Sequence, residues 1–79
     1  MGGKKVLNTC ILLKVMPTRA DKVLNTVRSM NKVEKAYFTF GRFDIVIFAE
    51  VEDYKELKGL ANNINGVDGV RSTETLSEA

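Results

Sequence analysis

The stretch of residues 45–49, Ile-Val-Ile-Phe-Ala, constrains the fold more than any other feature, because it contains five consecutive apolar residues. Side chains along a β-strand point alternately to the two faces of a sheet. A strand through this stretch therefore has apolar side chains on both faces. Residues 10–13, Cys-Ile-Leu-Leu, show the same pattern. Because a sheet with helices on only one face normally alternates apolar and polar residues, something has to cover the second face.

Four segments are predicted to be strands, because they are rich in β-branched, aromatic and other apolar residues. They span residues 8–16, 33–40, 44–51 and 70–76. Pro17 ends the first strand, since proline cannot donate a hydrogen bond to a sheet ladder. Gly41 lies in the short connection between the second and third strands, which favours a hairpin there.

Two segments between these strands have apolar residues at helical spacing. The first predicted helix spans about residues 19–30, with Thr18 and Asp21 as a capping pair at its start. The second begins after Asp53, its expected N-cap, and ends near Gly66. The element order is therefore βαββαβ.

This order predicts an α+β, ferredoxin-like fold, in which a four-stranded antiparallel sheet carries two helices on one face. The two doubly apolar strands would be central, and the helices would leave one of their faces uncovered. A second copy is the simplest cover, since a two-fold interface needs only one self-complementary patch. We therefore expect dimerisation through the sheet, as a dimeric α/β barrel. Either Val46 and Phe48 or Ile45 and Ile47 would face the partner.

The residue inventory argues against several functional classes. With no His and a single cysteine, Cys10, the chain lacks the usual residues for a zinc site or for acid-base and nucleophilic catalysis. We expect a non-enzyme without metal or cofactor, in which Cys10 is a buried core thiol. The 12 Lys and Arg and 10 Asp and Glu are interspersed, so no basic patch for nucleic acid is predicted.

The apolar runs are far shorter than the roughly 20 residues of a membrane span. The lone cysteine and the absence of a signal-peptide pattern indicate a cytoplasmic protein. A chain of 79 residues fits one small domain. We therefore expect a single domain over residues 1–79, with residues 1–5 as a flexible N-terminus and no membrane contact.

Two clusters combine groups that can bind a small ligand. Gly41, Arg42, Phe43 and Asp44 offer close backbone approach, both charges and a flat apolar wall. In the last strand, residues 73 and 75 are both threonines, and their spacing of two places both hydroxyls on one face. From spacing alone, the same residues are equally well explained as turn and edge-strand residues.

Three features of the sequence resemble the ligand-binding and dimerisation domain of the Lrp/AsnC (feast/famine) transcription regulators. They are the apolar strand that ends at Pro17, the G-x-x-D spacing of Gly41 and Asp44 between two apolar strands, and the ending Gly-Val-Arg-Ser-Thr-Glu-Thr at residues 69–75. The resemblance extends over about residues 6–78. Members of this family usually carry an N-terminal helix-turn-helix domain, whereas only residues 1–5 precede the resemblance here, so direct DNA binding is not implied.

The resemblance implies a stand-alone effector-binding module. Such modules form dimers and ring-like assemblies of dimers, with small molecules, usually amino acids, bound between them. A partnership with full-length regulators of the family is also implied. In an amino-acid site, Asp44 can bind the ammonium, and Thr73 and Thr75 can bind the carboxylate together with the backbone amides of Gly41 and Arg42.

The remaining contacts of such a site stay open. Phe43 or Met16 can meet the side chain of the amino acid. Arg42 can instead reach a neighbouring subunit, and the groups that bind ammonium and carboxylate can be exchanged. The hairpin of one subunit would approach the last strand of another.

Two other functions remain as alternatives. A small enzyme of the dimeric α/β-barrel type shares the sheet-on-sheet arrangement, but it needs polar groups inside the barrel, where this chain has mainly Ile, Val, Leu and Phe. A ferredoxin-like interaction or RNA-binding module needs aromatic residues on its central strands. Here Tyr37, Phe38 and Phe40 fall on the second strand instead.

Overall fold

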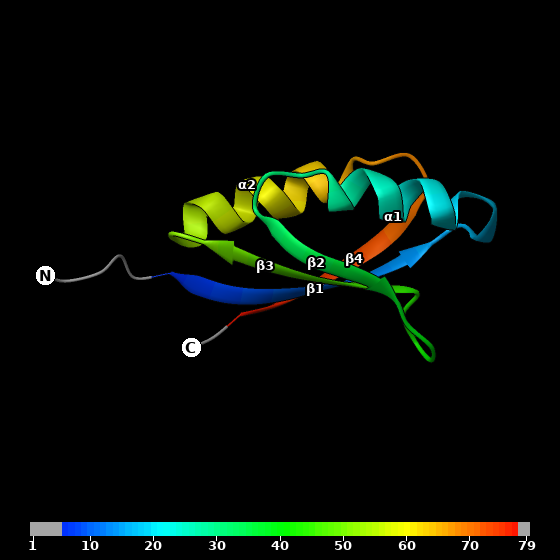
Figure 1. Ribbon diagram of the computed structural model, residues 1–79, viewed down its shortest axis with the longest axis horizontal. Helices are drawn as coiled ribbons and strands as arrows, with labels where there is room; N and C mark the ends of the chain where they lie inside the picture. The colour runs from blue at the N-terminus through cyan, green and yellow to red at the C-terminus, as the bar shows by residue number, and fades with distance from the viewer. Residues whose placement is uncertain (1–5, 78–79) are drawn as a thin grey trace, which may run out of the picture.

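The computed structural model of the chain describes residues 6–77 as one sheet covered by two helices (Figure 1). The elements are β1 (Leu7–Val15), the 3-10 helix η1 (Pro17–Arg19), α1 (Ala20–Arg28), β2 (Val33–Phe38), β3 (Ile45–Val51), α2 (Tyr54–Asn65) and β4 (Val70–Ser77). The strand order is β2-β3-β1-β4, and each neighbouring pair is antiparallel. The predicted ferredoxin-like βαββαβ fold and the central position of β1 and β3 are thereby confirmed.

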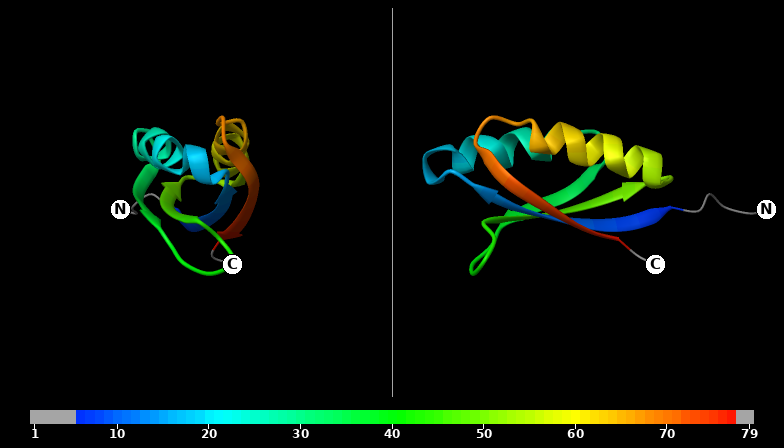
Figure 2. Two further views of the ribbon diagram at one scale, coloured as in Figure 1. Left: turned by 90° about the vertical axis from the view of Figure 1, so that its right-hand side faces the viewer. Right: turned by 180° about the vertical axis from the view of Figure 1, so that it is seen from behind.

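Both helices lie over the same face of the twisted sheet (Figure 2). The core lies between the sheet and the helices. It consists of the strand residues that face the helices and of the apolar stripes of the helices. Ile47 and Ile45 pair with Ile11 and Leu13 across β3 and β1, and all four are fully buried. From the helices, Val23, Val27 and Ile64 are also fully buried against this layer. The even-numbered residues of β3, Val46 and Phe48, therefore point away from the helices.

The predicted cap of α2 is confirmed, whereas the predicted capping pair of α1, Thr18 and Asp21, is wrong. Asp53 caps α2, because its Oδ1 accepts a 2.8 Å hydrogen bond from the backbone N–H of Glu56. At α1, Thr18 lies inside η1, and the N-cap Arg19 makes no side-chain capping hydrogen bond. The cause is Pro17, whose fixed φ suits the first position of a helical turn. The turn therefore begins one residue before the expected cap.

The second strand is shorter than predicted. We expected strands over residues 33–40 and 44–51, but β2 ends at Phe38 and β3 begins at Ile45. The N–H of Thr39 donates to the carbonyl of Asp44 at 2.9 Å and closes the ladder there. Residues 40–43 thus form a loop. The predicted flexibility of residues 1–5 lies outside the described residues.

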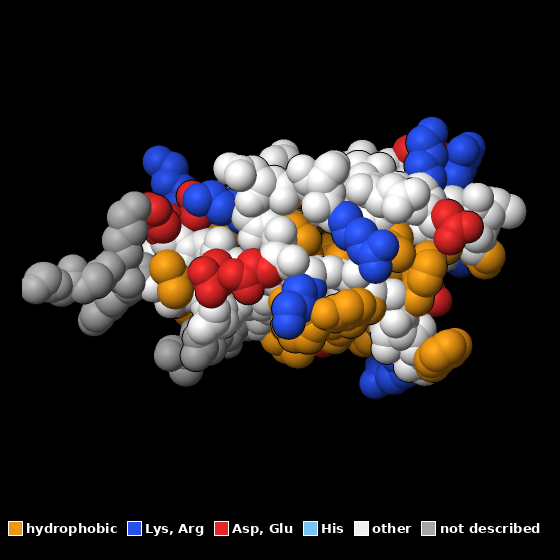
Figure 3. All heavy atoms as spheres, in the orientation of Figure 1, with side chains coloured by type: hydrophobic (Ala, Val, Ile, Leu, Met, Phe, Trp, Pro, Cys, Tyr) orange, Lys and Arg blue, Asp and Glu red, His pale blue; other side chains and the backbone are white. Residues whose placement is uncertain are grey.

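The face of the sheet that the helices leave free carries a contiguous apolar patch. We call this patch the open face and define it by Cys10, Leu12, Tyr37, Val46, Phe48 and Leu76, which neighbour one another in the strand register. Tyr37, Phe48 and Leu76 are 45%, 42% and 51% exposed. In Figure 3, hydrophobic side chains gather along the lower side of the molecule, away from the helices. The uncovered face that the sequence predicts is therefore present in the single chain.

Two titratable groups on this side of the sheet have shifted pKa values. Cys10 is half-buried on the open face and not in the core between sheet and helices, so the expectation of a core thiol is wrong. Partial burial raises the pKa of its thiol. Glu50, at the end of β3, has a raised pKa because the Glu34 carboxylate lies beside it. Among residues 6–77, no helix is long and apolar enough to cross a membrane.

Candidate functional site

Asp44 anchors the hairpin loop between β2 and β3 to the end of β1. Its backbone N–H donates to the carbonyl of Leu13 at 2.7 Å, and its Oδ2 accepts a 2.9 Å hydrogen bond from the N–H of Val15. The first bond extends the β1–β3 ladder by one residue. In the second, the side chain of Asp44 accepts in place of a backbone carbonyl. The carboxylate is therefore held in place at the mouth of the loop while the residue as a whole stays exposed.

Beside this carboxylate lies a cavity of about 330 Å³. It is enclosed by the end of β1, the η1 turn, the start of α1 and the hairpin. Its lining residues are Val15, Pro17, Ala20, Phe38, Thr39, Phe40 and Asp44. Apolar side chains form most of the wall, and Asp44 is the charged residue among them. This combination of an apolar wall with a single fixed carboxylate suits a ligand that carries both an apolar group and a cation.

The other predicted site residues do not line this cavity. Gly41 has a φ of +110°, a conformation that favours glycine, and apart from its chain neighbours no atom lies within 4 Å of the position a Cβ would take. Arg42 is exposed, and Phe43 is half-buried. Met16 is 47% exposed, and its N–H donates to the carbonyl of Gly69 at 2.8 Å.

Thr73 and Thr75 lie on one face of β4, as predicted, but a single chain does not bring them to the hairpin. They pair with Leu13 and Ile11, whose side chains face the helices. β4 is the strand at one edge of the sheet, and the hairpin strand β2 is at the other. With neighbouring strands about 4.8 Å apart, two strands separate the threonines from β2. Asp44 itself continues β3 beside β1, so β1 lies between it and β4, and in one chain it and the threonines form two separate clusters.

Several lining residues were missed by the sequence analysis. Phe38 and Phe40 were assigned to a continuous strand, whereas Phe38 ends β2 beside the cavity and Phe40, 99% exposed, lies in the loop. The signal that could have identified them is the pair of aromatic residues within the three positions before Gly41. Ala20 and Pro17 had no comparable signal, because only the fold brings the start of α1 to the hairpin. Among the described residues, no cluster of three or more His, Cys, Asp or Glu could hold a metal ion.

The chain is similar to known proteins in both sequence and fold. The profile of the family described as Lrp/AsnC ligand binding domain matches residues 9–77. No curated protein sequence matches the chain. Among solved structures, AsnC of E. coli is 26% identical with a TM-score of 0.85, and the match covers 91% of this chain and 50% of AsnC.

Two further solved structures share the fold at lower sequence identity. TTHA0845 from Thermus thermophilus is 23% identical with a TM-score of 0.89, and the match covers 92% of each chain. The transcriptional regulator NMB0573 from Neisseria meningitidis, solved as a complex with L-Met, is 16% identical with a TM-score of 0.82. That match covers 92% of this chain and 49% of the regulator.

Proposed function

This chain belongs to the Lrp/AsnC ligand-binding domain family, and from that premise we propose that it is an effector-binding and oligomerisation module that binds a free amino acid at its hairpin. The observation that supports this most is the Asp44 carboxylate, fixed at the rim of an apolar cavity. A regulatory rather than catalytic role accords with the family and with the absence of His from the chain.

Asp44 is suited to bind the ammonium of the amino acid. Its Oδ2 accepts from Val15, and no hydrogen bond within the described residues involves its Oδ1. A carboxylate that is held by a backbone N–H and keeps one oxygen for a ligand is preorganised for a charge-assisted hydrogen bond. The apolar wall formed by Val15, Pro17 and Phe38 then accepts the ligand's side chain. Phe43 and Met16 are not among the residues that line the cavity.

The carboxylate of the amino acid needs partners that the cavity of one chain does not supply. We assign it to Thr73 and Thr75 of a neighbouring subunit, together with the backbone amides of Gly41 and Arg42. The exposed guanidinium of Arg42 can reach the same neighbour. A complete site then forms only between subunits, which couples ligand binding to assembly.

The open face supports dimerisation through the sheet. Burial of each large apolar side chain contributes about 1.5 to 3 kcal/mol, so six residues of this patch supply a large driving force relative to the stability of a small domain. The charged side chains of Lys14, Lys35, Glu50 and Glu74 occupy the same face around the patch, as a polar rim surrounds an interface core. Dimers joined by contact between the hairpin of one subunit and β4 of another would form a ring-like assembly.

Association with full-length relatives follows from the same surfaces. This chain spans half the length of E. coli AsnC, and an open face of the same kind can pair with that of a DNA-binding relative. We propose that the module modulates transcription in the cytoplasm through such mixed assemblies, without contacting DNA itself. The L-Met complex of the Neisseria regulator supports an amino acid as the class of effector.

A thermal-shift screen of the purified chain against the twenty amino acids tests the proposal. A ligand present at 100 times its dissociation constant stabilises the folded protein by about 2.7 kcal/mol, which for a domain of this size raises the melting temperature by about 10 °C or more. We expect one amino acid or a few related ones to produce this shift. A screen in which none of the twenty changes the melting temperature contradicts the proposal.

A further inference from the structure

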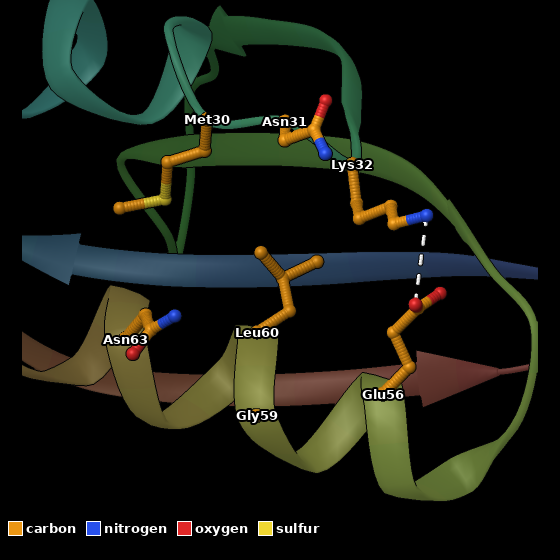
Figure 4. A pocket seen from close by; sticks show the side chains of 7 residues that line it. All are labelled: Met30, Asn31, Lys32, Glu56, Gly59, Leu60 and Asn63. Atoms are coloured by element: carbon orange, nitrogen blue, oxygen red, sulfur yellow. Dashed lines mark ion pairs between the residues drawn. The ribbon is translucent and has the colours of Figure 1, made fainter.

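A second and larger cavity lies away from the hairpin, as a groove between α2 and the segment that follows α1 (Figure 4). Its volume is about 500 Å³, and its lining residues are Met30, Asn31, Lys32, Glu56, Gly59, Leu60 and Asn63. Met30 extends from one wall and Leu60 from the other, so that their apolar ends approach one another (Figure 4). The groove shares no lining residue with the cavity beside Asp44.

No contact within the described chain explains why residue 59, in the wall of this groove, is a glycine. It lies within α2, where glycine destabilises a helix relative to alanine. Of the other described glycines, Gly41 and Gly69 have positive φ, and Gly66 lies at the C-cap of α2 with a φ of −85°. Apart from its chain neighbours and the surrounding helix backbone, no atom lies within 4 Å of a Cβ placed at Gly59. Nothing inside the described chain therefore requires glycine there, and its effect is to leave the α2 backbone bare along the groove.

The polar groups of the groove carry no net charge. Lys32 Nζ and Glu56 Oε2 are 3.5 Å apart and form an ion pair across one end (Figure 4). Glu56 Oε1 also accepts a 2.8 Å hydrogen bond from the N–H of Glu52. Both oxygens of this carboxylate are thus engaged, and a charged ligand would gain little from a pair that is already neutralised.

The carboxamides of Asn31 and Asn63 complete the wall of the groove. Each offers two N–H donors and one acceptor oxygen, and neither makes a side-chain hydrogen bond to another described residue. They suit a ligand whose edge presents both donors and acceptors. The thioether of Met30 makes favourable contacts with aromatic rings, and the bare backbone at Gly59 admits a flat ring.

From the apolar side chains of Met30 and Leu60, the bare backbone at Gly59, the neutralised ion pair and the two carboxamides, we propose that the groove is a second binding site. It takes a neutral, flat heteroaromatic molecule with both donors and acceptors on its edge. The ring lies over Met30 and Leu60 and against the backbone at Gly59. Its edge meets Asn31 and Asn63. This site is independent of the proposed amino-acid site, so the failure of one leaves the other standing.

The test is a titration of the full chain with adenine, followed by the NMR signals of backbone amides, the Asn side-chain amides and the methionine methyl groups. We expect saturable shifts of Met30, Gly59, Leu60 and Asn63. Cyclohexanecarboxamide, which keeps an amide but has no flat ring, should produce none at the same concentrations. The proposal is overturned if adenine causes no saturable shift, if both probes bind alike, or if adenine shifts hairpin residues 39–44 instead.

Two variants separate this role from a structural one. Gly59→Ala should raise the melting temperature, because alanine is the better helix former, and should weaken adenine binding at least tenfold because its methyl group fills the bare strip. Asn62→Ala, an exposed α2 position outside the groove lining, is the matched control and should leave binding unchanged. Adenine binding that survives Gly59→Ala unaltered would also overturn the proposal.

Discussion

The ring of Tyr37 packs edge-to-face against the ring of Phe48, with their centroids 6.4 Å apart and their planes at 66°. The two residues come from β2 and β3, and both remain more than two-fifths exposed on the open face. Aromatic pairs of this kind favour burial beyond their area alone. The pair lies among apolar neighbours that no part of the described chain covers, and we expect it to mark the centre of the dimer interface.

Phe48→Asp tests this interface, and Ile47→Asp tests the opposite face of the same strand. A charge at Phe48 should dissociate the dimer, because burial of an unpaired carboxylate costs several kcal/mol. A charge at Ile47, which is fully buried under the helices, should instead unfold the chain. Light scattering and circular dichroism distinguish the two results. A wild-type chain that scatters as a monomer at micromolar concentration, or a Phe48→Asp variant that dimerises normally, contradicts the assignment.

Thr73→Val and Thr75→Val test the contribution of β4 to the amino-acid site. Each substitution removes one hydroxyl at nearly constant shape, and the loss of one hydrogen bond should weaken binding by about 1 kcal/mol, or roughly fivefold. The matched control is Ser72→Ala, on the opposite face of the same strand. Calorimetric titration with the amino acid found in the screen measures all three. Equal affinities in the threonine variants and the wild type would return these residues to a purely structural role.

Glu50→Gln tests the carboxylate pair beside the open face. The Glu34 carboxylate raises the pKa of Glu50 above its ordinary value of 4.5, so the folded chain binds this proton more tightly than the unfolded chain does. Its contribution to stability is fully present below pH 4.5 and is lost as the pH rises through the raised pKa. The variant should therefore melt at a higher temperature than the wild type at about pH 7, and its melting temperature should depend less on pH between about 4 and 7.

Glu74→Gln, an exposed carboxylate on β4, is the control for this pH experiment, because it removes the same charge away from Glu34. It should leave the pH dependence of melting unchanged. If Glu50→Gln and the wild type have parallel melting profiles over the same pH range, the Glu34–Glu50 interaction does not influence stability.

A gel-shift assay with genomic fragments tests whether the chain binds DNA by itself. At physiological salt the purified chain should shift no fragment in a sequence-dependent way, because its net charge is only +2 and both described helices pack on the sheet. Addition of the chain to a full-length DNA-binding relative should change the mobility of that protein's complex. A sequence-specific shift by the chain alone contradicts this prediction.

Local pattern was sufficient to predict the fold because each element carries its own signal. Helical spacing and the Asp53 cap identified α2, and the doubly apolar stretches identified β3 and β1 as central. The same double-sided pattern could not tell which face of β3 meets the helices, since both faces are apolar. Only the packed structure decides this, by burying Ile45 and Ile47 and leaving Phe48 exposed.

The candidate site could be predicted less fully from the sequence than the fold, because contacts between residues far apart in the chain form it. The strand-forming residues Phe38, Thr39 and Phe40 predict a longer β2, but the bond from Thr39 to Asp44 ends the ladder. Residues beyond it have no partner strand. Likewise, the spacing of Gly41 and Asp44 suggests a ligand loop, whereas the hydrogen bond from Val15 that fixes the Asp44 carboxylate joins residues 29 apart in the chain.

Calorimetric titration of the wild type and Asp44→Asn with the amino acid identified in the thermal-shift screen tests whether Asp44 binds the ligand's ammonium. Asparagine keeps an oxygen that can accept from the N–H of Val15, so the variant should fold and dimerise normally while it loses the charge that pairs with the ligand's ammonium. Loss of that charge should cost about 2 kcal/mol or more, a factor of about thirty in affinity. If Asp44→Asn binds the amino acid as tightly as the wild type does, the ammonium is bound elsewhere and the proposed site is wrong.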